Sequence, residues 1–291
     1  MSSATLNNQD RRSHARKQAF LGLAKLPALS PTAAQLLGRL ARRNCEVHEL
    51  AVLIEGDPLL SAQILGIANS AAFGRAHPIS SVQHAISMVG IGAVRKFALA
   101  RSISNLFAKR KIAPSFSITR FNLHSVATGM FLELLASVVP LEDSEEAFLA
   151  GLFHDVGKLI IAVAMPEQYE NIVTASAVTG ESQLESERRM LRIDHAELSA
   201  LAVDYWGLGE TIRSAAEHHH EPEKAPALGK ISLALAISKV DAVVNAAGMS
   251  LLPARPVVEI PPLEFEGFPL DQGLLFERFA TEWTTAGALY R

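Results

Sequence analysis

The sequence predicts an all-α protein built from two helical subdomains. Apolar residues recur at helical spacing through most of the chain, and Ser30-Pro31 and Asp57-Pro58 are typical of helix starts. No two segments alternate apolar and polar residues as paired strands would, and the strand-like stretch 257–260 has no evident partner. With 291 residues, of which 49% are hydrophobic, the chain can bury a sizeable core.

The first subdomain is expected over residues 19–112, after a disordered basic tail at residues 1–18. Serine or aspartate before proline supplies an N-cap and a proline at the first helical position, and glycine ends a helix. These signals predict helices that follow Ser30-Pro31, follow Asp57-Pro58, run from Ser80 or Ser81 to Gly90, and span about residues 93–108.

The second subdomain is expected over residues 113–248. Asp143-Ser-Glu-Glu146 and Asp194-His-Ala-Glu197 both have the spacing of a capping box with aspartate as the N-cap. The predicted helices are 118–138, the helix that Asp143 opens and that ends near His154, 194–206, 210–219 and 228–247. Residues 249–291 are expected to be a carboxy-terminal extension with a final helix at 271–289.

Composition indicates a protein of a reducing cytoplasm. The single cysteine, Cys45, excludes an intrachain disulfide and a cysteine-based zinc site. The polar residues 1–18 do not resemble a signal peptide, and the apolar run 152–164 is interrupted by His, Asp, Gly and Lys. The net charge of −3 argues neither for nor against binding of nucleic acid by the whole chain. The basic residues are interpreted as a solvated face without a nucleic-acid partner: Arg95, Lys96, Arg101, Lys109, Arg110 and Lys111.

The adjacent residues His154 and Asp155 carry the strongest chemical signal. They stand with Lys158 in an apolar helical stretch, where charged or polar side chains are rare unless paired or bound to metal. Imidazole and carboxylate suit a divalent transition metal, and lysine suits a phosphate oxygen. Adjacent residues diverge by about 100° around a helix, so one metal needs a helix end or a second helix there. Gly157 would permit such an end.

Further candidate ligands lie along the chain. His124 precedes His154 by 30 residues, His195 follows an aspartate, and Asp241 lies in an apolar helical stretch. Of the triplet 218–220, His219 is expected to project inward with the apolar register of its helix. The alternative is that His154 and Asp155 form a buried pair that fixes helix packing, and that His195 merely begins its helix beside a cap.

A histidine, then His-Asp about 30 residues later, then a distal aspartate resembles the HD superfamily of metal-dependent phosphohydrolases. Further motifs resemble the HDOD family, HD-related output domains of bacterial signalling proteins. The resemblance covers about residues 20–225 and depends on Leu26-Pro27, Asp57-Pro58-Leu-Leu, Ala68-Asn69-Ser70-Ala71, Ile79 to Ile86, Gly90-Ile-Gly, Gly151 to Lys158, and Asp194-His-Ala-Glu.

The resemblance implies an all-α bacterial signalling or regulatory protein that acts mainly by binding protein partners or a nucleotide ligand, with little or no catalysis and no membrane association. The alternative is a metal-dependent phosphohydrolase acting on a nucleotide or cyclic dinucleotide. In that case Fe, Mn or Zn would bind, and Lys158 would steady the phosphate. The metal ligands would be His124, His154 and Asp155, with weaker candidates His195, His219 and Asp241.

Two departures weigh against catalysis in this interpretation. The HD pattern aligns Ser238 with the distal aspartate, so Asp241, nearly one helical turn later, reaches the site only if the helix shifts. The related HD-GYP phosphodiesterases continue their histidine pair into a Gly-Tyr-Pro signature, whereas this chain continues with Glu221-Pro222. Hydrolysis of cyclic-di-GMP therefore has no specific support in the sequence.

Overall fold

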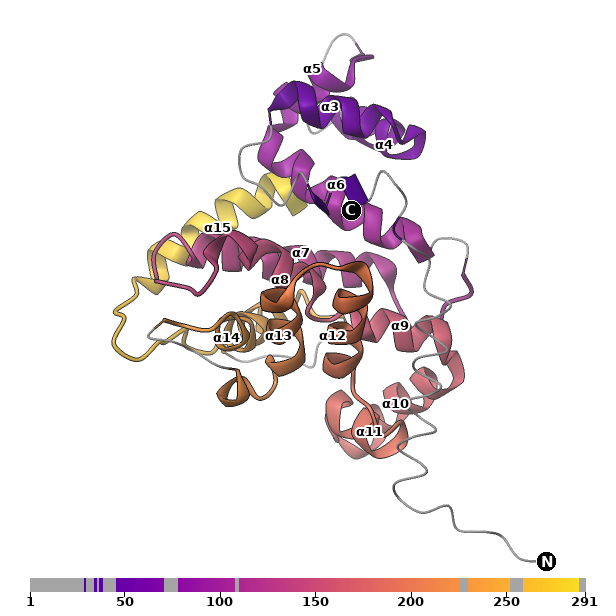
Figure 1. Ribbon diagram of the computed structural model, residues 1–291, viewed down its shortest axis with the longest axis vertical. Helices are drawn as coiled ribbons and strands as arrows, with labels where there is room; N and C mark the ends of the chain where they lie inside the picture. The colour runs from indigo at the N-terminus through magenta and orange to yellow at the C-terminus, as the bar shows by residue number, and fades with distance from the viewer. Residues whose placement is uncertain are drawn as a thin grey trace, which may run out of the picture.

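The computed structural model describes residues 29, 34–35, 37–38, 46–70, 78–107, 110–225, 230–251 and 259–287. These residues form α-helices and two short 3₁₀ helices, with no β-strand among them and two isolated bridges, Leu141 to Ile231 and Phe265 to Phe268. The predicted all-α class with two helical subdomains is confirmed (Figure 1). The predictions for residues 1–18, for Ser30-Pro31 and for residues 257 and 258 of the strand-like stretch lie outside the described residues.

The amino-terminal subdomain lies at one end of the molecule in Figure 1. Its helices are α3 (Val47–Glu55), α4 (Pro58–Ala68), α5 (Val82–Val89) and α6 (Ile91–Phe107). The cap signal at Asp57-Pro58 acts as predicted, because the Asp57 carboxylate accepts from the backbone N–H groups of Leu59 and Leu60. Asn69 closes the following loop by bonding both backbone groups of Ile79 at 2.6 and 2.8 Å.

The second subdomain carries most of the helices. They are α7 (Ile118–Leu135), α8 (Ala147–Phe153), α9 (Val156–Ala164), α10 (Pro166–Thr179), α11 (Gln183–Met190), α12 (His195–Trp206), α13 (Glu210–His218) and α14 (Leu233–Ala246), with 3₁₀ helices at Ser144–Glu146 and Pro222–Lys224. Helix α7 is the central element, since α6, α8, α14 and the final helix α15 (Gln272–Gly287) all pack against it. In Figure 1, α15 runs back along α7 toward α6.

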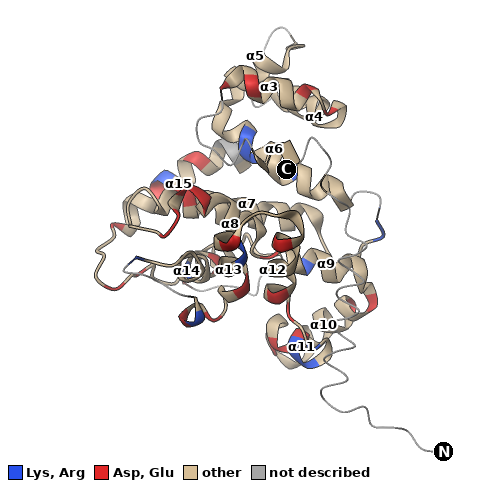
Figure 2. Cartoon of the chain, in the orientation of Figure 1, with Lys and Arg blue, Asp and Glu red and all other residues tan. Residues whose placement is uncertain are grey.

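Buried ion pairs join the two subdomains. Arg95 Nη2 and Lys96 Nζ of α6 lie 2.9 and 2.8 Å from the two carboxylate oxygens of Glu133 on α7. The prediction of a solvated face is therefore wrong for Arg95 and Lys96, which are buried against neighbouring helices. Figure 2 shows the remaining Lys and Arg residues of the described part dispersed over several helices.

The connection before α8 differs from the predicted capping box. Asp143 adopts a left-handed conformation with φ 43° and makes no side-chain cap, and a 3₁₀ turn precedes the helix. Its carboxylate instead accepts from the hydroxyl of Thr211, 2.8 Å away. A long-range hydrogen bond that the sequence does not reveal has replaced the local one.

Helices α8 and α9 form the buried centre of this subdomain. Of the described residues, only Ser144–Ala164 has the length and apolar composition of a membrane span, and 83% of its most apolar window is buried inside the protein. Close packing explains this burial. A Cβ on Gly151 of α8 would lie 2.6 Å from the Cα of Gly129 on α7, so only glycines allow these helices to approach so closely.

Candidate metal centre

His154 and Asp155 occupy the junction between two helices. His154 follows the last residue of α8 and Asp155 precedes the first residue of α9, with φ −106° and ψ 7° at Asp155. This break solves the problem posed by adjacent ligands, because both side chains can turn to the same side. The predicted helix end therefore exists, but it lies before Gly157, which is inside α9.

Two further helices bring the rest of a first cluster to this junction. His124 comes from α7 and Asp241 from α14. His124 Nε2 lies 3.3 Å from Asp155 Oδ2, 3.1 Å from Asp241 Oδ1 and 3.4 Å from His154 Nε2. The four potential ligand atoms lie within 4.8 Å of one another. The structure thus brings together residues that are more than a hundred positions apart.

Hydrogen bonds fix the orientation of the imidazoles. His154 Nδ1 lies 2.7 Å from the carbonyl oxygen of Gly151. His124 Nδ1 lies 3.1 Å from the carbonyl oxygen of Met249. A carbonyl oxygen can only accept, so Nδ1 carries the proton in both rings. In the neutral ring the Nε2 lone pair then faces the cluster. Metal-bound histidines in proteins are held in the same way.

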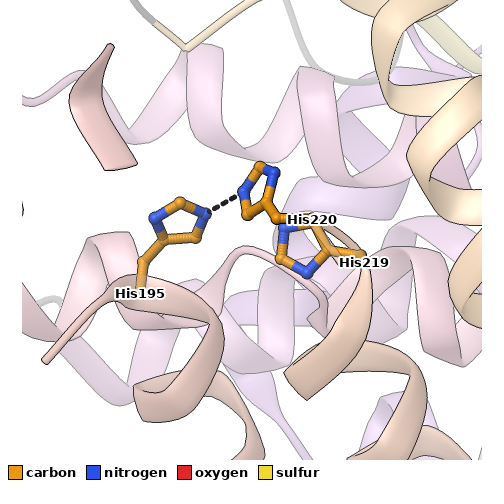
Figure 3. A group of neighbouring side chains, drawn as sticks. All are labelled: His195, His219 and His220. Carbon is orange, nitrogen blue, oxygen red and sulfur yellow. Dashed lines mark hydrogen bonds between the residues drawn. The ribbon is translucent and has the colours of Figure 1, made fainter. Parts of the chain in front are cut away.

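A second cluster consists of His195, His219 and His220 (Figure 3). His195 is the first residue of α12, while His219 and His220 follow the end of α13. His195 Nε2 lies 2.8 Å from His220 Nε2. The Nδ1 atoms of His195 and His219 are held by Glu187 Oε2 at 2.6 Å and by the Ala216 carbonyl at 2.8 Å. These two rings also direct Nε2 toward the interior of their cluster.

Asp155 lies between the two clusters. Its Oδ2 faces the first cluster, whereas its Oδ1 lies 3.3 Å from Nε2 of His195 and 3.8 Å from Nε2 of His219. Asp155 Oδ1 and His219 Nε2 are buried and have no hydrogen-bond partner among the described residues. Buried polar atoms without a partner are costly. A cation between these two atoms would satisfy both.

The charge distribution of the first cluster favours a cation. Burial opposes protonation of His124, yet hydrogen bonds to Asp155 and Asp241 raise the pKa of His124 to about 9. Asp155 is buried too, but Lys158 and the surrounding histidines hold the pKa of its carboxyl well below the usual range. Without metal, the positive charge is carried by Lys158 and the imidazole of His124.

The second cluster instead favours neutral imidazoles. Burial, reinforced by the neighbouring histidines, lowers the pKa of His220 to about 3 and that of His219 well below its ordinary value. Neutral imidazole is the form that coordinates a metal. Both rings therefore have lone pairs available at neutral pH.

Lys158 lies beside the carboxylate of Asp155, and its side chain is less buried than that of Asp155. Its Nζ is 2.6 Å from Asp155 Oδ2. The side chains of Lys158 and Asp241 are 14% and 17% exposed, whereas those of His124, His154 and Asp155 are at most 1% exposed.

All the candidate residues named from the sequence meet at this centre. Asp241 reaches the first cluster, where its Oδ1 lies 3.1 Å from His124 Nε2 and 3.6 Å from His154 Nε2, and so provides a carboxylate that Ser238 could not. His220 was missed; its position next to His219 was the signal, but helical register alone favoured one ring. His218 instead lines an open surface pocket with Arg188 and Glu221. Glu187 was also missed, because its glutamate-rich helix gave no sign of burial.

The two clusters therefore contain side chains that could hold divalent metal. The first offers two imidazoles and two carboxylates, and the second offers three imidazoles and shares Asp155. Nitrogen and oxygen ligands of this kind suit Fe, Mn or Zn. Backbone carbonyls and Glu187 behind the rings supply the outer hydrogen bonds that metal sites require.

Residues 26–222 match the model of the HDOD domain family. The chain belongs to the HDOD family. A curated relative, an uncharacterized protein of Treponema pallidum (strain Nichols), is 23% identical over 207 residues. That match covers 69% of this HDOD chain and 39% of the relative, so the chain spans well under half of the relative's length.

Solved structures share the fold across nearly the whole chain. An HDOD domain protein of unknown function from Geobacter sulfurreducens has a TM-score of 0.74 at 22% identity and covers 97% of this chain and 98% of its own. A candidate signal transduction protein from Marinobacter aquaeolei VT8 has a TM-score of 0.71 at 20% identity, and the match covers 99% of this chain and 67% of that protein. A candidate phosphohydrolase from Shewanella amazonensis SB2B has a TM-score of 0.65 at 21% identity, and the match covers 94% of this chain and 96% of that protein.

Proposed function

We propose that this HDOD protein is a metal-dependent phosphohydrolase whose centre holds two divalent ions. The supporting observation is the position of Asp155, which turns one carboxylate oxygen to each of two histidine clusters. Sites that hold two divalent ions are a common arrangement for hydrolysis of phosphate esters. Asp241 strengthens the proposal, since the sequence named it only as a weaker candidate and its Oδ1 lies 3.1 Å from His124 Nε2.

The residues of the chain would divide the work. His124, His154, Asp155 and Asp241 would hold the first ion, and His195, His219, His220 and Asp155 the second. Bound divalent ions supply Lewis acidity toward a phosphate oxygen and lower the pKa of water. Lys158 would bind a phosphate oxygen, because its ammonium group lies 2.6 Å from Asp155 and its side chain is not fully buried. The phosphate of a nucleotide or cyclic dinucleotide is the proposed substrate class.

The regulatory interpretation, which the sequence favoured, is the second candidate. Its specific support is the enclosure of the centre, because most of the potential ligands are buried and the Gly-Tyr-Pro continuation is absent after His220. In that case metal or a bound nucleotide would set the shape in which the protein meets a regulatory partner. Both candidates use the same residues, so they differ in turnover and not in metal binding.

One experiment separates them. Protein purified without chelator would be analysed for Fe, Mn and Zn, then assayed with bis(p-nitrophenyl) phosphate and p-nitrophenyl phosphate under each metal. The hydrolase proposal expects turnover that disappears in the His154→Ala, Asp155→Ala double variant. Asp204→Asn, an exposed change on α12, is the control and should keep full activity. Metal-loaded protein without turnover on either ester would reject the hydrolase and favour the regulatory role.

A further inference from the structure

Helix α11 contacts the second histidine cluster from outside through two consecutive residues. Glu187 and Arg188 point to different partners, although they are neighbours in sequence, because adjacent side chains diverge around a helix. Glu187 is buried, whereas Arg188 lies at the surface with its side chain 43% exposed. Neither belongs to the set of potential ligands, yet each contacts a segment that carries one.

Glu187 holds the ring of His195. Its Oε2 accepts from Nδ1 of His195 at 2.6 Å and from the backbone N–H of the same residue at 2.8 Å. A carboxylate behind Nδ1 fixes the tautomer, leaves the Nε2 lone pair for a metal and increases the basicity of the ring. The other oxygen, Oε1, is buried and has no partner among the described residues. A carboxylate so buried needs a positive charge nearby, which an ion bound to His195 would provide.

Arg188 joins the two segments that carry the histidines. Its Nε donates to Asp194 Oδ2 at 2.7 Å, and its Nη1 donates to Glu221 Oε1 at 3.2 Å. Asp194 precedes His195 and caps α12 by accepting from the N–H of Glu197. Glu221 follows His220. One guanidinium therefore links the residue before one potential ligand to the residue after another.

We propose that Glu187 and Arg188 are positioning residues for the second metal ion. Glu187 orients His195 and tunes its affinity, while Arg188 sets the distance between the His195 and His220 segments. This inference rests on the two-ion centre of the proposed function. It adds that the second ion depends on α11, whereas the first ion does not.

Glu187→Gln tests the first half. Glutamine keeps the size and one acceptor oxygen but removes the charge, so we expect the second ion to bind about 10- to 100-fold more weakly. The first ion should be retained. Competition titrations with Zn²⁺ and the visible absorption spectrum of the Co²⁺-loaded protein would report affinity and ligand geometry directly. Circular dichroism of the metal-free variant would verify that its helices are intact.

Arg188→Met tests the second half, with Arg189→Met as its matched control. Arg189 is the next residue on the same helix and pairs only with Glu181 among the interactions of the described residues. Both variants remove one guanidinium and keep an aliphatic side chain. We expect weaker second-ion binding and an altered Co²⁺ spectrum in Arg188→Met alone. A loss of equal size in Arg189→Met would show a general effect of α11 and would overturn the positioning role of Arg188.

The outcomes separate this inference from the proposed function. A wild-type protein that binds two ions but hydrolyses no ester would reject the hydrolase, while a weakened second ion in Glu187→Gln would still support positioning. Two ions in wild type with unchanged affinity and spectrum in Glu187→Gln and Arg188→Met would overturn positioning alone. A wild-type protein that binds at most one ion under saturating Zn²⁺ would overturn both.

Discussion

Gly157 lies directly against the backbone carbonyl of His195. A Cβ at position 157 would stand 2.0 Å from that oxygen, closer than any real contact allows. The Gly157 N–H donates to the hydroxyl of Ser199, which in turn donates to the same carbonyl. Helix α9, which follows Asp155, is thereby packed tightly onto the first turn of α12, and this contact sets how far the two clusters lie apart.

Gly157→Ala should displace α12 and weaken the second ion. The backbone oxygen cannot yield as a flexible side chain could, so the free energy of unfolding should fall by about 2 kcal/mol or more, as for other overpacked sites. Thermal melts and metal analysis would measure both effects. Gly92→Ala on α6 is the control, because a Cβ there has no neighbour within 4 Å. Similar melts for the two variants would contradict the close contact.

Asp155→Ala should abolish the stabilisation that metal provides while leaving the helical content unchanged. Ions that bind only the folded protein raise its melting temperature, and Asp155 is the carboxylate that both ions would share. Thermal melts of wild type and variant, each with and without chelator, would measure how much the melting temperature depends on metal in each protein. If chelator leaves the wild-type melt unchanged and the variant loses about 1–3 kcal/mol in both conditions, Asp155 is a packing residue.

Asp241→Asn should weaken the first ion more than the second. Asp241 Oδ1 lies 3.1 Å from His124 Nε2 and accepts from the Asn245 amide at 3.0 Å, and among the described residues it forms no hydrogen bond or ion pair with the three histidines of the second cluster. Removing its charge also leaves His124 with one carboxylate instead of two. Sequential Zn²⁺ titration would resolve the two affinities. Equal weakening of both would mean that the ions bind as one cooperative unit.

His220→Ala should remove the second ion, while His218→Ala should not. His220 Nε2 meets His195 Nε2 in the cluster, whereas the side chain of His218 is 24% exposed and faces a surface pocket. The two variants delete the same side chain two positions apart, so a difference in bound metal reports the location of the ring. Loss of metal in His218→Ala alone would reverse the assignment within the triplet.

Cyclic-di-GMP should be hydrolysed slowly or not at all. The chain continues from His220 to Glu221-Pro222, without the Gly-Tyr-Pro signature of HD-GYP enzymes. An assay with added manganese or iron is sufficient. Rapid turnover that the His154→Ala, Asp155→Ala double variant eliminates would show that this substrate needs no such signature.

The sequence allowed the fold class and the junction at His154-Asp155 to be predicted, because both depend on local information. Helical spacing is visible along the chain, and adjacent polar residues in an apolar helix are conspicuous. Asp241 was doubtful because three positions along a helix change the direction of a side chain, and only the packing of α14 on α7 decides it.

The features that were missed depend on contacts between different helices or between a helix and a connection. Arg95 and Lys96 are residue types that usually lie at the surface. Glu133, 37 to 38 positions later on another helix, forms ion pairs with them. Asp143 has the spacing of a cap, but Thr211 offers it a different partner. Glu187 lies in a strongly polar helix, and only the fold reveals that it is buried against His195.

Helix α7 connects the ion pairs of Arg95 and Lys96 to the first cluster. The same helix carries Glu133, which binds the amino-terminal subdomain, and His124, which belongs to the first cluster. These residues are nine positions apart, which corresponds to about 13–14 Å along the axis. A displacement of α6 must either break the two ion pairs or carry α7 with it. The candidate metal centre and the amino-terminal subdomain are thus joined through one continuous helix.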